Sequence, residues 1–169
     1  MKPDTVPVAL TFADDTIGIL WFVVTEYGRD GVPVWSRRDS DAEIAREIAK
    51  ASKSIPPAKL PVRSWRVLAE EQVPKDRTFR DAWRDRDGRI VVDMPAAREL
   101  HRERIRRARV SALAVLDIEY QRAGETADKI ARAYVVAQKQ ALRDAPADPR
   151  IEQAVTLEEL ASVWPEGLK

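Results

Sequence analysis

The sequence predicts an α+β fold, in which an N-terminal antiparallel sheet with one helix precedes a C-terminal antiparallel helical hairpin and a short terminal helix. Two observations support this prediction. Short apolar runs separated by turn residues fill the N-terminal part, and a helical repeat of apolar residues runs through Met94–Asp144. We therefore expect a small sheet domain at residues 1–73, a connector at 74–93, and a hairpin with its tail at 94–169.

The N-terminal part begins with predicted strands that alternate with turns. Val6–Phe12 is a short apolar run, Asp14–Thr16 is a turn signal, and Ile17–Thr25 is rich in β-branched and aromatic residues. A second turn at Gly28–Gly31 and the stretch Val32–Ser36 predict a third strand. Because the second strand is continuously apolar, we expect it to be central and covered on both faces.

One amphipathic helix and a further strand complete the predicted sheet domain. In Asp41–Ser52, apolar residues recur at helical spacing while charged residues face away. Pro56 and Pro57 stop this helix, because proline has no N–H to donate. Alternation of residue types in Val62–Glu70 predicts a strand that joins the same sheet.

The expected connector is polar and mixed in charge. Phe79 and Trp83 lie four residues apart, which predicts a helical turn with both rings on one side. Gly88 ends this segment, and Arg89–Val92 is a short predicted strand.

The hairpin is predicted from two apolar stripes that a break at Ala123-Gly124-Glu125 separates. Asp93 suits the N-cap of the first helix, and Pro95 suits its first turn. Because the break is short, the helices should be antiparallel neighbours that bury their stripes together. The first stripe comprises Ala97, His101, Ile105, Ala108, Ala112, Leu116 and Tyr120, widened by Leu113 and Val115, and the second comprises Ala127, Ile130, Ala131, Tyr134, Ala137, Gln138, Ala141 and Leu142.

The tail carries two further helix signals. Asp148-Pro149 can begin a short turn of helix. Thr156 and Glu159 form a capping box, which predicts a final helix over Leu157–Val163.

Composition limits the classes of protein and of site. The chain has 169 residues, enough for one domain or one domain with a small appendage. Its 29 basic and 28 acidic residues give a net charge of +1, which argues neither for nor against an acidic partner. With no cysteine, disulfides, thiolate metal sites and thiol nucleophiles are excluded. The longest apolar run is too short to span a bilayer, and the N-terminus lacks the order of a signal peptide, so we expect an intracellular protein without a membrane partner.

No catalytic, cofactor or metal site is predicted. His101 is the only histidine, and Glu99 and Glu103 lie on different faces of its helix. No Gly-rich phosphate loop, nucleophile elbow or His-Glu metal motif is present. We therefore expect a protein that is not an enzyme, and a hydrolase would need His101 in a pocket beside a nucleophile.

The arginines of the first long helix are the candidate binding groups. They can form an anion-binding face for nucleic acid, or a solvated or protein-contacting face with intrahelical ion pairs. Arg102, Arg106 and Arg109 share a face while Arg104 and Arg107 lie well round from it, and this spread favours the second interpretation. A tryptophan directly before a proline near the C-terminus suits docking. The candidate partner-binding residues are therefore Arg98, Arg102, Arg106, Arg109, Arg143, Trp164 and Pro165.

From about Pro74 onward the chain resembles proteins of tailed bacteriophages and prophages. Residues 76–83 and 92–98 resemble phage proteins encoded among tail genes. The two long helices are similar to phage tail assembly chaperones, in which an arginine-rich helix precedes a second helix ending in Leu-Arg-Asp and Pro, and then a terminal Trp-Pro. The matching residues are Arg106, Arg109, Asp117, Gln140, Ala141, Leu142, Arg143, Asp144, Pro146, Trp164 and Pro165.

This resemblance implies a non-enzymatic phage protein that acts in tail or tail-fibre assembly, or as a minor virion component. Its partner would be another phage structural protein, met in the host cytoplasm during assembly or in the virion. The alternative is a nucleic-acid-binding phage regulator or counter-defence protein that uses the arginine-rich helix. The sequence leaves the oligomeric state open.

Overall fold

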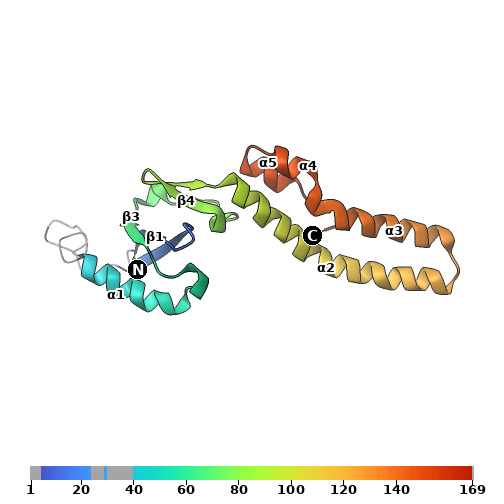
Figure 1. Cartoon of the computed structure of the whole chain (residues 1–169), viewed down its shortest axis with the longest axis horizontal. Coiled ribbons are helices and arrows are strands. Elements are labelled where there is room, and N and C mark those ends of the chain that lie inside the picture. The colour runs from blue at the N-terminus through green and yellow to red at the C-terminus, as the bar shows by residue number, and fades with distance from the viewer. Residues whose placement is uncertain (1–4, 24–28, 30–39, 169) are drawn as a thin grey trace. The chain divides into compact units, whose positions relative to one another are not determined.

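The computed structural model describes residues 5–23, 29 and 40–168 and confirms the α+β class. The chain divides into two compact units, Met1–Asp93 and Met94–Lys169. The first contains all the strands of the described residues, and the second contains the long helices (Figure 1).

The sheet of the first unit has β1, not β2, at its centre. β1 (Thr5–Thr11) pairs antiparallel with β2 (Ile17–Val23) on one side and with β3 (Ser64–Val67) on the other. Our prediction that the second strand is central is therefore wrong for the described residues. The predicted strand at Val32–Ser36 and most of the turn before it lie outside them.

β1 is central because it is covered on both faces. Val8 and Leu10 pack with Ile48 of helix α1 (Ser40–Ala51) on one face. Ala9 packs with Trp83 in a second cluster on the other face. A short apolar run thus becomes the covered strand, while β2 exposes Trp21. The predicted helix and the predicted pairing of the third described strand are both confirmed.

The expected connector contains a β-hairpin that belongs to the first unit. β4 (Trp83–Arg86) pairs antiparallel with β5 (Arg89–Val92), and the turn between them uses positive φ angles at Asp87 (51°) and Gly88 (75°). The predicted helical turn is wrong from Trp83 onward, because that residue begins β4. The described residues of this unit also form short 3-10 turns at η2 (Ser52–Ser54), η3 (Pro57–Lys59), η4 (Glu70–Gln72) and η5 (Arg80–Ala82).

The second unit is the predicted helical hairpin with a folded tail. Helix α2 (Met94–Glu125) lies antiparallel to α3 (Lys129–Asp144) in Figure 1. The tail comprises η6 (Ala145–Ala147), α4 (Pro149–Gln153) and α5 (Leu157–Ser162). Asp148 caps α4, and the Thr156–Glu159 capping box begins α5, so both helix signals of the tail are confirmed.

The break between the long helices lies three residues later than predicted. Ala127 adopts a left-handed φ of 54°, and the Asp128 N–H donates to the Ala123 carbonyl at 2.9 Å. The Ala127 N–H donates to the Gly124 carbonyl at 3.2 Å, which completes a Schellman motif. Asp128 then caps α3 by accepting from two backbone N–H groups. Gly124, the expected break, is therefore part of α2.

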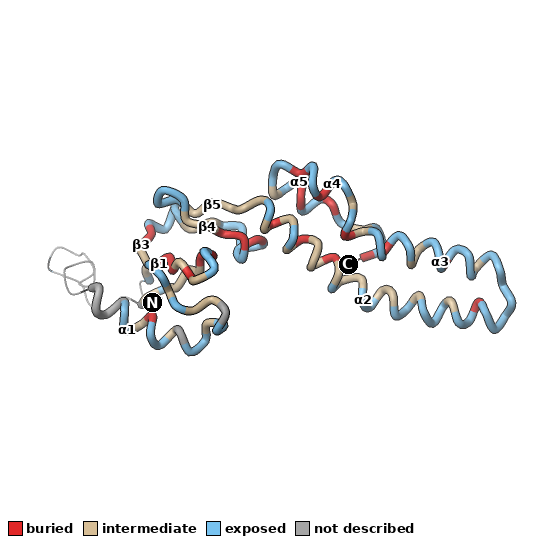
Figure 2. Tube along the Cα trace, in the orientation of Figure 1, coloured by how far each residue is buried: buried red, intermediate tan, exposed pale blue. Residues whose placement is uncertain are grey.

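The buried side of α3 is also rotated from the prediction. Val135 and Leu142 are buried, whereas Ile130 and Tyr134, which we placed in the buried stripe, are 85% and 65% exposed. Figure 2 shows that α3 is mostly exposed along its length. Because α3 has apolar residues on more than one side, periodicity alone did not select the side that packs against α2.

Candidate protein-binding surface

The hairpin unit has two parts with opposite surface chemistry. We call residues 94–109 and 142–168 the base, and residues 110–141 the arm. The base contains the arginine cluster and the folded tail, and its α2 segment buries Ala97, His101 and Ile105. The arm contains the outer half of α2, most of α3 and the turn between them.

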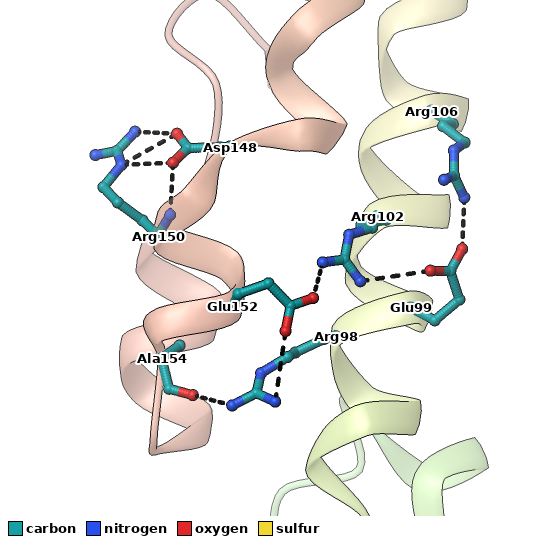
Figure 3. A network of polar contacts seen from close by, with 8 residues as sticks. All are labelled: Arg98, Glu99, Arg102, Arg106, Asp148, Arg150, Glu152 and Ala154. Carbon is teal, nitrogen blue, oxygen red and sulfur yellow. Dashed lines mark hydrogen bonds and ion pairs between the residues drawn. The ribbon is translucent and has the colours of Figure 1, made fainter.

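Arginines near the start of α2 hold the tail against this helix. The Arg98 guanidinium donates to the Ala154 carbonyl at 2.8 Å and lies 3.7 Å from the Glu152 carboxylate. Arg102 donates to the same carboxylate (Figure 3). Because Glu152 and Ala154 belong to α4 and its C-cap, these two arginines hold a distant segment of the chain in place.

The remaining charges of this face pair along α2. The Arg106 guanidinium donates to Glu99 at 2.7 Å, and Arg107 donates to Glu103 at 3.1 Å. Hydrogen bonding from Arg106 lowers the pKa of Glu99, and hydrogen bonding from Arg102 lowers the pKa of Glu152. The arginine face is thus largely neutralised by carboxylates of its own chain (Figure 3).

Arg109 joins the two long helices at the boundary between base and arm. Its guanidinium donates to the carbonyl of Arg143 at 2.7 Å and to that of Leu142 at 3.2 Å. Both carbonyls lie in the last turn of α3, where backbone acceptors have no helical partner. Arg109 therefore caps α3 and holds its end against α2.

His101 holds the C-terminal segment on α2. Its side chain is 3% exposed, and its Nε2 lies 2.7 Å from the Val163 carbonyl oxygen. The Trp164 ring meets the imidazole edge-to-face at 5.7 Å between centroids, and its indole N–H donates to the Leu168 carbonyl at 3.0 Å. Nε2 thus faces a backbone carbonyl of the chain, which gives His101 a structural role.

The predicted binding residues are thus divided in their surroundings. Arg98, Arg102 and Arg109 are engaged inside the base, and Arg106 pairs with exposed glutamates. The remaining three predicted residues are at least partly exposed to solvent. Arg143 and Trp164 are exposed and Pro165 is partly exposed. Whether any of the seven contacts a partner stays a prediction.

The arm exposes large apolar side chains beside its charged ones. Ile130 is 85% exposed, Val110 66% and Tyr134 65%. Surface apolar residues that occur singly need no explanation, whereas residues that share one side of a helix can form an interaction site, as Val115 and Ile118 do on α2 and Ile130 and Tyr134 do on α3. The other large exposed apolar residues of the arm are Val115, Ile118 and Val136.

One edge of the arm is hollowed into an apolar groove of about 690 Å³. Val115 and Leu116 line it from α2, and Tyr134 and Ala141 line it from α3. Glu166 reaches its base end and is the only charged residue in the lining. The groove therefore offers apolar surface along its length and one carboxylate at an end.

The opposite edge of the arm is closed by polar contacts. Lys139 pairs with Asp117. The Arg132 guanidinium donates to the Tyr120 hydroxyl at 2.5 Å and stacks 4.5 Å from the centroid of that ring. Arg132 and Lys139 are the cations of α3 that follow its first residue within the arm. Because both make contacts on this edge, the groove edge stays apolar.

A signal for this surface was present in the sequence. Residues 133–138 read Ala-Tyr-Val-Val-Ala-Gln and carry no charge. A helix whose apolar residues extend beyond one face has more apolar surface than one neighbour can cover. Reading α3 as a single buried stripe missed this surplus.

Comparisons with protein families, with curated proteins and with solved structures found no match to this chain. No described helix combines the length and the low charge that a membrane span needs. Among the described residues, no three histidine or carboxylate side chains gather closely enough to hold a metal ion.

Proposed function

We propose that this chain is a non-enzymatic assembly protein that binds another polypeptide through the arm. The exposed apolar side chains of the arm carry this proposal. The resemblance to phage tail assembly chaperones gives its class, which is a protein of tail or tail-fibre assembly or a minor virion component.

The chemistry of the arm suits a protein partner. Burying a large apolar side chain that was fully exposed contributes about 1.5–3 kcal/mol, so covering several such residues supplies a substantial driving force. The groove between α2 and α3 has the shape that accepts one apolar face of a helix. Nucleic acid would instead require free cations, and Arg98, Arg102 and Arg109 are already engaged by the chain itself.

Co-purification with phage tail polypeptides encoded beside this chain tests the proposal. We expect a complex that the variant I130D/Y134D loses, because each aspartate places a charge in the apolar contact. The matched control is R143E, which reverses one exposed charge of the predicted arginine surface. A complex that survives the first variant and is lost in the second would reject the arm and favour the surface predicted from sequence.

The nucleic-acid alternative has its own test. Binding to duplex or single strands at low salt that weakens steeply as salt rises would support it, since each neutralised phosphate releases counterions. We do not propose it, because no observation on the hairpin unit favours it over protein binding.

A further inference from the structure

We propose that, when no tail polypeptide is bound, the arm is covered by a second copy of this chain, packed antiparallel about a two-fold axis. This inference rests on the proposed function, in which the arm is a protein-binding surface. It adds the identity of the occupant and the direction in which it lies.

Two apolar stripes border the groove. Val115 and Ile118 share one side of α2, and Ile130 and Tyr134 share one side of α3, since residues three or four apart lie on one helix face. The groove lies between these stripes. Two such hairpins can pack as a four-helix bundle, with helices crossing at about 20° and apolar stripes in contact.

The two ends of this surface carry charges of opposite sign that have no ion-pair partner among the described residues. Glu166 lies at the base end, because Trp164, two residues before it, contacts His101. Arg122 follows Ile118 by four residues on the same side of α2, at the tip end. Both side chains are exposed, and neither forms an ion pair or side-chain hydrogen bond within the described part of the chain.

These charges fit an antiparallel second copy. From Ala112, beside Glu166 in the groove, to Arg122 is ten residues of α2, or about 15 Å of helix. A two-fold axis through the middle of this span, near Leu116, exchanges its ends. It therefore brings Arg122 of each copy to Glu166 of the other. A parallel arrangement would instead place like charges together, which is unfavourable.

The two-fold arrangement also accounts for the apolar centre. Val115 and Tyr134 lie near the proposed axis, so each would meet the same stripe of the other copy. An interface of this kind is isologous, and one patch covers itself. A single surface with opposite charges at its ends and apolar residues between them is self-complementary in this sense.

Mass measured by light scattering or sedimentation tests the contact. We expect the full chain to be a dimer, and V115D and Y134D to weaken its dissociation constant at least about 100-fold. V110D and V136D are matched controls, because they also alter exposed valines. These valines are turned about 140° from Val115 and about 160° from Tyr134 on their helices, so both controls should remain dimers. Loss of the dimer in all four variants alike would overturn the proposed surface.

Charge exchange tests the direction. R122E and E166R alone should each weaken the dimer roughly tenfold, because two symmetry-related pairs become like-charged. The double variant R122E/E166R should recover the affinity of the unchanged chain. A double variant weaker than both single variants would overturn the antiparallel pairing, and circular dichroism of each variant checks that the helices remain folded.

The two proposals fail separately. A chain that stays monomeric at its highest soluble concentration overturns the second copy as partner. The proposed function would then stand if a foreign tail polypeptide bound the chain and Y134D released it. If neither a second copy nor a tail polypeptide bound the arm, both proposals would be rejected.

Discussion

The base and the arm are parts of the same helical hairpin, yet their surfaces follow opposite rules. The base is rich in arginine and glutamate, and Arg98, Arg102, Arg106 and Arg109 pair with carboxylates or backbone carbonyls of the same unit. The arm carries few charges on its groove edge and leaves Ile130 and Tyr134 exposed. Residue type alone therefore does not identify a binding face. What decides is whether the chain itself already supplies a partner for the group.

Core truncation should separate the two parts most strongly. Ile105→Ala removes a fully buried side chain of the base, and we expect the free energy of unfolding to fall by about 2–5 kcal/mol. Val110→Ala in the arm truncates an exposed side chain outside the proposed dimer contact and should change the free energy of unfolding by no more than about 0.5 kcal/mol. Urea unfolding of both variants measures this contrast. Equal losses would show that the arm of the isolated chain is packed as tightly as the base.

Removing one arginine at a time tests which arginines hold the structure. Arg109→Met leaves two carbonyls at the end of α3 without their charged donor, and should cost about 1.5–3 kcal/mol. Arg107→Met removes only an exposed pair with Glu103, and its cost should be about 0–1 kcal/mol. Thermal unfolding provides the measurement. A loss at Arg107 as large as that at Arg109 would contradict the division between cap and surface pair.

Exchanging two residues at the tip tests the position of the break. Ala127→Gly relieves a left-handed backbone at φ 54° and should stabilise the unit by roughly 0.5–1 kcal/mol. Gly124→Ala adds a methyl group in open space within α2 and should stabilise it by a similar amount, about 0.5–1 kcal/mol. Chemical denaturation of the single and double variants checks both values. A destabilising Gly124→Ala would place the break where the sequence predicted it.

A weak pH dependence should distinguish the base from the arm. Hydrogen bonding from Arg102 lowers the pKa of Glu152, so this carboxylate stabilises the folded state above its unfolded pKa near 4.5. That contribution is lost as pH falls through the lower pKa of the folded state. The unfolding midpoint of Glu152→Gln should therefore change less between pH 6 and pH 3 than that of the unchanged chain. Glu119→Gln, which alters an exposed glutamate of the arm, serves as the control and should keep the full dependence.

The fold was largely predictable from local signals. The capping box at Thr156 and the N-cap at Asp148 begin α5 and α4 as predicted, because such caps depend on a few neighbouring residues. The central strand was mispredicted, because its burial depends on Ile48 and Trp83, which approach from distant segments. The helix break was misplaced, because glycine permits a left-handed turn without requiring one.

The candidate surface was less predictable than the fold. The sequence drew attention to the arginines, which a residue count makes conspicuous. It did not show that Glu152 and the Ala154 carbonyl would reach Arg98, some fifty residues away in the chain. Nor did it show which side of α3 would remain uncovered. Both depend on contacts between segments far apart in sequence.

The sequence by itself determined that this chain forms strands, then two long antiparallel helices and a capped tail. Periodicity, turns and caps each depend on a few neighbouring residues, so they can be recognised without knowledge of any tertiary contact. Only the tertiary structure decided which apolar and charged groups are satisfied. The return of the tail onto α2 engages the arginines of the base, while α3, which has apolar residues on more than one side, can turn only one of them toward α2. The groove of the arm is the apolar surface that remains.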